Sequence, residues 1–473
     1  MTVFLSIFIV VTLLAIFHII MYGSRASRSL SWILILLLLP ILGALLYAVF
    51  GINRRRIKIY PLKETTRRKL YDFELVENDV ADTKDDFPSV KGRKLANLMR
   101  KSALFPAYRG NKVKVLQHGE ATFETIFTAL EKAERFIHLQ YYIFEKGELL
   151  DRLYEIFSKK IKEGVEIRIL YDAIGSFSLP SKEIKRFKEL GISIYKTMPL
   201  RYGSFLFTLN YRNHRKIIII DGIVGFTGGM NVSDKYIKSE DHLGIWDDTH
   251  VKMEGPVVDG LHRIFIKDFF FASENENLLK ESYLPQLDKV GDTVAQIVSS
   301  GPDSDHPSIM QQYIAMINLA EESIYISNPY FIPNTAMLES IRIAALGGVE
   351  VKILIPLKSD SWLAKHSMMA SFEELLYLGV EIYVQKDNFL HSKLIVLDCE
   401  TASIGSGNFD HRSFEHNFET NALIYSNQVS QQIADDFIKD CESSEKLEYD
   451  TFKNRPFKQK LSEGFARFFS PLL

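Results

Sequence analysis

The chain of 473 residues has only two cysteines, Cys399 and Cys441, which excludes a disulfide scaffold and a cysteine zinc cage. It also lacks an excess of either charge, since 57 basic and 59 acidic side chains give a formal net charge of −2. Nucleic-acid-binding domains usually carry a strong basic excess, so we expect no nucleic-acid partner. Hydrophobic residues make up 47% of the chain, which excludes a wholly disordered protein.

Charge is absent from two long apolar segments near the N-terminus, residues 3–22 and 30–50. Each has the length of about 20 residues that a helix needs to cross a bilayer. A cleaved signal peptide is the alternative for the first segment, but no basic residue precedes it and no small-residue cleavage pattern follows it. We therefore predict two transmembrane helices within residues 1–52, the second kinked at Pro40.

A cluster of basic side chains follows the second segment, within residues 54–69. Because the more basic flank of a membrane span stays in the cytosol, the rest of the chain is predicted to be cytoplasmic. The same cluster would attract the anionic headgroups of a lipid bilayer. The sequence thus indicates a multi-pass membrane protein, with a basic juxtamembrane segment and linker over residues 53–105.

Beyond the linker, apolar runs of strand length alternate with helical patterns, which predicts an α/β fold with sheets covered on both faces. The pattern occurs twice. VEIRIL at 165–170 returns as VEVKIL at 349–354, and FIHLQYYIF at 136–144 has a counterpart in IYISNPYFI at 324–332. We predict two similar α/β repeats packed side by side around a pseudo-twofold active site, over residues 106–280 and 281–445.

The C-terminal tail, residues 446–473, carries apolar side chains at helical spacing, among them Leu461, Phe465 and Phe468. This pattern is typical of an amphipathic helix. A helix lying in the membrane interface and a helix packed on the rest of the protein both fit it.

The repeat is tightest around two copies of H-x-K-x4-D. One is His214, Lys216 and Asp221; the other is His391, Lys393 and Asp398. A glycine follows each histidine at +14, and an asparagine follows at +17: Asn231 in the first copy and Asn408 in the second. Two copies that share these offsets are not accidental.

Strand geometry gives these residues their expected roles. Side chains two apart point to the same side, so each histidine shares a face with its lysine. Asp221 and Asp398 belong to the motifs and are grouped with their catalytic residues, but opposite parity and a strand-end position favour a structural role for them.

Two imidazoles, two ammonium groups and two carboxamides around a pseudo-twofold axis are suited to a phosphodiester. Lys216, Lys393, Asn231, Asn408 and Ser406 are the candidates to bind its oxygens and stabilise the charge of an in-line displacement. A purely structural interpretation would leave two buried lysines unexplained. Two lysine charges reduce the need for a metal, and no carboxylate cluster is evident, so neither a metal nor another cofactor is expected.

A histidine nucleophile needs an acceptor for its second ring nitrogen. Downstream of the motifs, Asp248-Thr249-His250-Val251 aligns with Glu419-Thr420-Asn421-Ala422. Asp248 and Glu419 are therefore predicted to orient the two histidines. The alternative is that both are ordinary carboxylates at strand ends.

The paired motifs, followed by GGMN and GSGN, resemble the phospholipase D superfamily, and most closely its bacterial cardiolipin synthases. The resemblance extends over nearly the whole chain and includes PILGALLYAVFG, NYRNHRKIIIIDG and GSGNFDHRS. It implies a phosphatidyltransferase of the bacterial plasma membrane that uses phosphatidylglycerol as donor and acceptor. His214 would attack the phosphorus and His391 would act as acid and base, although the near-symmetry of the motifs leaves the reverse assignment open.

Two positions depart from the family pattern. Related sequences usually have Trp-Arg-Asp where this chain has Trp246-Asp247-Asp248, and Gly229 stands where the second copy has Ser406. The principal alternative function is a membrane-tethered phospholipase D, in which water resolves the same intermediate and releases phosphatidic acid. Exclusion of water and a pocket for the acceptor lipid distinguish the two functions. The sequence gives no oligomeric state.

Overall fold

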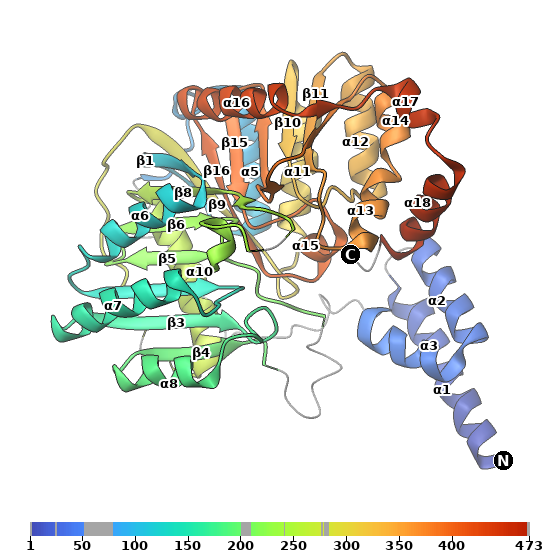
Figure 1. The fold of residues 1–473 in the computed structure, drawn as a ribbon, viewed down its shortest axis with the longest axis horizontal. Helices are drawn as coiled ribbons and strands as arrows, with labels where there is room; N and C mark the ends of the chain where they lie inside the picture. Colours follow the sequence, from blue (N-terminus) through green and yellow to red (C-terminus); the bar gives the residue numbers. More distant parts are fainter. Residues whose placement is uncertain are drawn as a thin grey trace.

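The computed structural model of the chain describes residues 2–23, 26–51, 79–199, 210–240, 242–275, 278 and 283–470. The basic cluster at 54–69 lies outside them. Figure 1 shows the two repeats as neighbouring α/β units, with the N-terminal helices at one end of the molecule.

In the described part of the chain, fifteen strands form one sheet, in the order β17-β12-β11-β10-β14-β15-β16-β9-β1-β8-β6-β5-β2-β3-β4. The first repeat supplies β1 (Ala107–Gln117), β2 (Phe136–Tyr141), β3 (Glu166–Asp172), β4 (Ser193–Thr197), β5 (Ile217–Ile220), β6 (Val224–Gly228) and β8 (Thr249–Glu254). The second supplies β9 (Thr293–Ser300), β10 (Ser323–Ser327), β11 (Glu350–Pro356), β12 (Glu381–Gln385), β14 (Leu394–Leu397), β15 (Thr401–Gly405), β16 (Glu419–Tyr425) and β17 (Glu445–Lys446).

The strand order is nearly symmetric about the antiparallel pair β1–β9, which joins the repeats edge to edge. The predicted repeats are present, but they share one sheet rather than packing as two separate ones. A second contact between the repeats is the short parallel pair of β7 (Trp246–Asp247) and β13 (Phe389–Leu390). This pair crosses from one repeat to the other immediately before His391 of the second motif.

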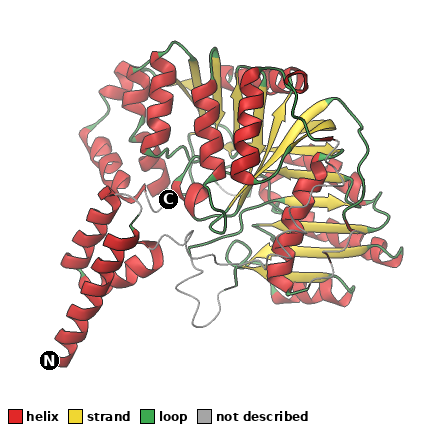
Figure 2. Cartoon of the chain, turned by 180° about the vertical axis from the view of Figure 1, so that it is seen from behind, coloured by secondary structure: helices red, strands yellow, loops and turns green. Residues whose placement is uncertain are grey.

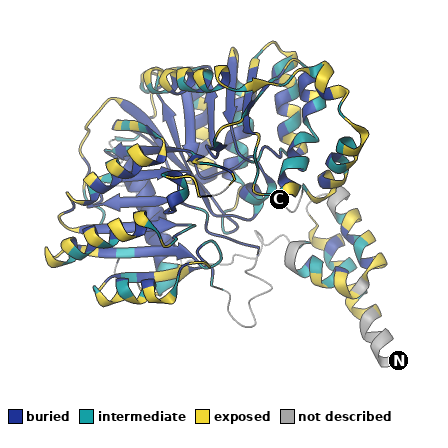
Figure 3. Ribbon diagram, in the orientation of Figure 1, coloured by how far each residue is buried: buried dark blue, intermediate teal, exposed yellow. Residues whose placement is uncertain are grey.

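Helices lie on both faces of the sheet, as Figure 2 shows, and Figure 3 shows that the strands between them are largely buried. The first repeat carries α6 (Gly119–Leu130), α7 (Glu148–Lys162), α8 (Ser181–Glu189) and α10 (Val257–Ser273). The second carries α11 (Ser308–Leu319), α12 (Thr335–Leu346), α13 (Trp362–Met369), α14 (Phe372–Tyr377), α15 (His411–Glu415) and α16 (Asn427–Glu442). The C-terminal tail carries α17 (Tyr449–Lys453) and α18 (Phe457–Phe469). The apolar strands, such as the four buried isoleucines of β5, are therefore sandwiched, as their continuous hydrophobicity predicts.

The last part of the predicted juxtamembrane segment and linker, residues 53–105, contains a helix. Residues 90–103 form α5 (Val90–Ala103), which begins at the capping residue Ser89 and buries Leu95 and Met99 in the core of the second repeat. The segment also contains five basic residues, so its composition resembles that of an exposed linker although one side of the helix is apolar.

The two apolar N-terminal segments are helical. The first is α1 (Thr2–Tyr22), and the second is divided at Leu39 into α2 (Ala26–Leu38) and α3 (Pro40–Leu46), with a π-helical turn over Tyr47–Gly51. The break coincides with the expected kink at Pro40, the first residue of α3. Among the described residues, no helix combines the length and hydropathy that a membrane span requires.

Candidate active site

Both motifs enter the sheet at corresponding positions, immediately before β5 and β14. His391, Lys216 and Lys393 are buried, and the side chain of His214 is 12% exposed. Lys216 Nζ donates to the carbonyl oxygen of His214 at 2.7 Å, and Lys393 Nζ also contacts the carbonyl of its own histidine. Each ammonium group of the motif therefore lies against the backbone of its own histidine.

Asp221 and Asp398 lie at the opposite ends of the same two strands, with φ values of 55° and 46°. Asp221 accepts backbone N–H groups from residues 134–136, each at 2.8 Å, and Asp398 accepts those of residues 321–323 and the ammonium of Lys91. Their grouping with the catalytic residues is therefore corrected. Both aspartates tie a strand end to the start of its neighbour, as their parity indicates.

The glycine at +14 is required by the neighbouring strand of the sheet, β8 in the first repeat and β16 in the second. A Cβ on Gly228 would lie 2.4 Å from His250 Nδ1, and one on Gly405 would lie 2.1 Å from Asn421 Oδ1. The repeat therefore needs glycine at this offset in both halves, because a side chain from β8 or β16 occupies the space.

Each histidine is oriented by a carboxylate from the other repeat. His391 Nδ1 lies 2.6 Å from Asp248 Oδ2, and His214 Nδ1 lies 3.0 Å from Glu419 Oε2. The backbone N–H groups are crossed as well: His391 donates to the carbonyl of Asp247 and His214 to that of Phe418. Both predicted partners therefore lie within hydrogen-bond distance of a histidine, and both contacts cross the interface between the repeats. With Nδ1 engaged, Nε2 is the nitrogen left for chemistry in each ring.

The two carboxylates are supported differently. Ser406 Oγ donates to Glu419 Oε2 at 2.5 Å and accepts from Thr420 N at 3.0 Å. At the equivalent place in the first repeat, a Cβ on Gly229 would lie 2.1 Å from Asp248 Oδ1. The first repeat therefore combines glycine with the shorter aspartate, and the second combines serine with the longer glutamate. Ser406, predicted to bind phosphate, is fully buried and instead holds Glu419.

Sequence reasoning missed a hydroxyl that follows each histidine at +22. Tyr236 OH lies 3.3 Å from His391 Nδ1 and accepts from Asn231 Nδ2 at 3.2 Å. Ser413, at the same offset from His391, donates to Glu419 Oε1 at 3.0 Å. Extending the comparison of the two motifs by five residues beyond the asparagines would have found both.

A cavity of about 300 Å³ opens over the two histidines. Of the described residues, those lining it include both histidines and both asparagines but neither motif lysine: Tyr142, Ile143, His214, Asn231, Trp246, Tyr330, Ile332, Asp360, Ser361, Ala364, His391, Asn408, Asp410, Arg412 and Asn417. Apolar and polar side chains thus share a space of the size that holds a small headgroup. Asp360, which accepts from Tyr330 OH at 2.6 Å, and Asp410 were not anticipated.

Burial and mutual repulsion set the charges beneath the cavity. Burial lowers the pKa of Lys216 to about 7, with Glu419 opposing the change and Lys393 adding to it. Burial and then the charges of Lys393, Lys216 and His214 hold the pKa of His391 well below its usual value. For His214, burial lowers the pKa and the charge of Glu419 opposes this. A bound anion would raise all three pKa values, because its negative charge favours the protonated forms.

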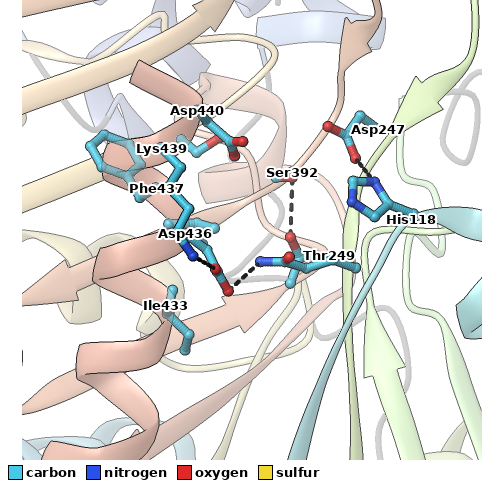
Figure 4. Close-up of a pocket in the computed structure, with 12 residues that line it drawn as sticks. His118, Asp247, Thr249, Ser392, Ile433, Asp436, Phe437, Lys439 and Asp440 are labelled. Atoms are coloured by element: carbon cyan, nitrogen blue, oxygen red, sulfur yellow. Dashed lines mark hydrogen bonds and ion pairs between the residues drawn. The ribbon is translucent and has the colours of Figure 1, made fainter. Parts of the chain in front are cut away.

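A second cavity, of about 220 Å³, lies behind the first, on the reverse side of the strands that carry the dyads. Figure 4 shows it lined by Asp247, Thr249 and Ser392, which alternate along the chain with Asp248, His391 and Lys393. His118 forms an ion pair with Asp247 at 3.2 Å. Within the described ranges, no group of three or more histidine, cysteine, aspartate or glutamate residues is arranged to hold a metal ion.

The chain is similar to known proteins over its whole length. A family model described as cardiolipin synthase, PLD-like domain, matches residues 126–268 and 313–441, and a phospholipase D-nuclease N-terminal model matches residues 10–51. The cardiolipin synthase of Alkalihalophilus pseudofirmus is 36% identical, with 99% of this chain and 94% of the relative aligned. Cardiolipin synthase 1 of Bacillus anthracis is 37% identical, with 98% and 92% aligned. The crystal structure of phosphatidylserine synthase from Haemophilus influenzae shares the fold, with a TM-score of 0.62 and 16% identity over 81% of this chain and all of that one.

Proposed function

Because the chain belongs to the cardiolipin synthase family of phospholipase D-like proteins, we propose that His214 and His391 pass a phosphatidyl group between two phosphatidylglycerol molecules. The protein is a phosphatidyltransferase, a cardiolipin synthase. The observation that carries the proposed mechanism is the pair of crossed dyads beneath one cavity. Phosphatidylglycerol as donor and acceptor, and the role of each residue, are parts of the proposal.

In the first step, His214 Nε2 attacks phosphorus and the bond from phosphorus to the glycerol oxygen breaks. The departing oxygen takes a proton from His391 Nε2, so glycerol leaves as a neutral alcohol. The charges of Lys216 and Lys393 stabilise the anionic oxygens from below, and the amides of Asn231 and Asn408 contact them from the cavity wall. His391 is hard to protonate in the empty site, so the charge of the bound phosphodiester is what allows it to carry its proton.

In the second step, the free hydroxyl of another phosphatidylglycerol loses its proton to His391 Nε2 and attacks phosphorus. The bond to His214 breaks, cardiolipin forms, and both rings regain their starting states. The proton given to glycerol in the first step is replaced in the second, so the cycle needs neither a nucleotide nor an external acid. Water in place of the second lipid would give phosphatidic acid, the product of the alternative phospholipase D.

We place this chemistry on the cytoplasmic side of a bacterial plasma membrane. Residues 3–22 and 30–50 are uncharged and long enough to be two spans, and the basic cluster at 54–69 favours the cytosol. Ile223 lies in the turn between β5 and β6 and is 49% exposed. A cysteine there, in a variant without Cys399 and Cys441, should react with an impermeant maleimide in inverted vesicles but not in intact spheroplasts. Labelling in intact spheroplasts would show that this part of the chain faces the outside of the cell, the opposite of the proposed topology.

The function is tested by reconstituting the full chain in phosphatidylglycerol vesicles with EDTA and without nucleotide. Cardiolipin and free glycerol should appear in equal amounts. Phosphatidic acid as the main product would identify a hydrolase and overturn the proposal. Loss of turnover in EDTA that added divalent cations restore would contradict the role given to the two lysines.

Gly229→Ser should reduce kcat by about 10- to 100-fold, because its Cβ displaces Asp248 from His391 by roughly an ångström. Gly229→Ala should lose as much activity, since the Cβ and not the hydroxyl collides. Steady-state rates with phosphatidylglycerol check both variants. Activity near that of the unaltered chain in Gly229→Ser would mean that the extra serine is accommodated as Ser406 is.

Glu419→Gln should move the acidic limb of the kcat/KM profile to lower pH. The negative charge of Glu419 raises the pKa of His214 against the effect of burial, so its removal lowers that pKa further. Because attack requires neutral His214, activity is lost as pH falls through this pKa, and the loss then occurs at lower pH. An unchanged limb would exclude His214 as the group that titrates there.

A further inference from the structure

The last helix of the chain, α18, presents an apolar stripe to the outside. Phe457, Leu461, Phe465 and Phe468 follow one another at intervals of four, four and three residues, and are 55–83% exposed. Residues at this spacing share one side of a helix. Such a continuous exposed stripe of large apolar side chains is a mark of an interaction surface rather than of an ordinary protein surface.

The opposite side of α18 is firmly packed, so the stripe is not the product of a loose helix. Ala466 and Glu463 are buried, and the carbonyl oxygen of Ala466 accepts from Ser367 Oγ of α13 at 2.9 Å. Glu463 is held by Arg455 through bonds of 2.7 and 2.9 Å. Of the two alternatives predicted for the tail, packing on the rest of the protein describes the inner side of α18, and a position in the membrane interface would use the outer side. One face packs on the protein, and the other is left without a partner among the described residues.

The charges of α18 favour an anionic surface as the occupant. Its only acidic residue, Glu463, faces inward and is neutralised by Arg455. Its basic residues Lys458, Lys460 and Arg467 lie outside this pair, and Lys458 and Arg467 are exposed. An exposed apolar stripe with basic flanks is the pattern of a helix that lies in the interface of an anionic bilayer.

The position of α18 points to the same occupant. Its partner α13 begins at Trp362, which is 55% exposed, and the neighbouring Ser361 and Ala364 line the cavity over the two histidines. The stripe therefore lies on the structure that borders the entrance for a two-chain lipid. Figures 1 and 2 show α18 at the same end of the molecule as the N-terminal helices, whose outer side chains, such as Leu14 and Phe17, are also exposed.

We propose that the outer face of α18 inserts into the membrane interface and holds the mouth of the active-site cavity against the anionic bilayer. The proposal rests on the proposed function, because it takes the substrate to be a lipid that enters from the membrane. Phe465 and Phe468 would reach the acyl boundary, and Lys458 and Arg467 the phosphate level. The N-terminal segments keep the enzyme at the membrane, while α18 sets the orientation of its cavity.

The direct test measures membrane depth. In the full chain without its two native cysteines, a fluorescent NBD group is attached at Phe465→Cys or, as control, at Ile223→Cys, two positions of similar exposure. In phosphatidylglycerol vesicles, spin-labelled lipids should quench the first several-fold more than the second. Equal quenching would overturn the proposal. A blue shift at position 465 without lipid quenching would also overturn it, since a protein would then cover the stripe.

A second measurement separates this proposal from the proposed function. Phe465→Ser combined with Phe468→Ser should lower cardiolipin formation several-fold in vesicles and leave turnover of monomeric, short-chain phosphatidylglycerol unchanged. The control variant Ile223→Ser should change neither rate. An equal loss on both substrates would mean that α18 only supports the fold. If the unaltered chain makes no cardiolipin, the proposed function fails, whereas the quenching result still decides where α18 lies.

Discussion

Replacing either His214 or His391 with alanine should lower cardiolipin formation by about 10⁴-fold or more, to the background of the assay. The two rings have different tasks in one displacement, and each is fixed by its own carboxylate at 3.0 Å or less. Removing the nucleophile prevents the covalent step, and removing the acid leaves glycerol to depart as an alkoxide. Because the two groups act as a unit, the double variant should be no worse than the worse single variant.

His250→Asn is the matched control for these losses. His250 is another buried histidine near the site, and Asn421 stands at the corresponding place in the other repeat. The control should keep most of its activity and its thermal unfolding temperature. Residual activity above about a tenth in His214→Ala or His391→Ala would contradict the two-histidine mechanism.

Asp248→Asn should reduce kcat by about 10³- to 10⁴-fold with little change in KM. The carboxylate accepts from His391 Nδ1 at 2.6 Å and lies 3.3 Å from Lys393 Nζ, in surroundings where it is fully buried. An amide has the same shape but can turn a donor toward the ring, which stabilises the wrong tautomer and leaves Lys393 without its counter-charge.

The division between kcat and KM distinguishes positioning from folding in this variant. Asp248 does not line the cavity, so substrate binding should survive while proton transfer does not. Asp248→Glu serves as a partial rescue, because it keeps the charge and changes only the reach of the carboxylate. A loss of less than tenfold in Asp248→Asn would show that the contact with His391 is structural only.

The residues that lie together at the site could be predicted from the sequence because the duplication repeats their local spacing. The histidine and lysine of each motif lie immediately before one strand, β5 or β14. The glycine ends the next strand, β6 or β15, and the asparagine lies in the loop after it. A repeated local geometry leaves the same spacing twice. For the same reason, the alignment of Asp248 with Glu419 points to the two carboxylates that lie within 3.0 Å of the histidines.

What the sequence could not give depends on how the two repeats meet. The crossed pairing of Asp248 with His391 follows from the contact of β7 with β13, two-residue strands with no pattern of their own. The role of Ser406 depends on whether its hydroxyl points to a substrate oxygen or to Glu419. A sequence motif does not specify the direction in which a side chain points. The helix α5 was missed because its basic residues outnumber the few apolar ones that it buries.

The central claim is a phosphatidyl group carried on histidine, and one measurement tests it most directly. A phosphatidyl donor with a p-nitrophenol leaving group needs no acid for its first step, so His391→Ala should still be modified by it and should then stall. Mass spectrometry of the quenched protein should find one phosphatidyl group on His214, and none when His214 is also replaced. Modification of His391 in the unaltered chain would reverse the roles. Release of p-nitrophenol with no phosphohistidine at either position would contradict the mechanism.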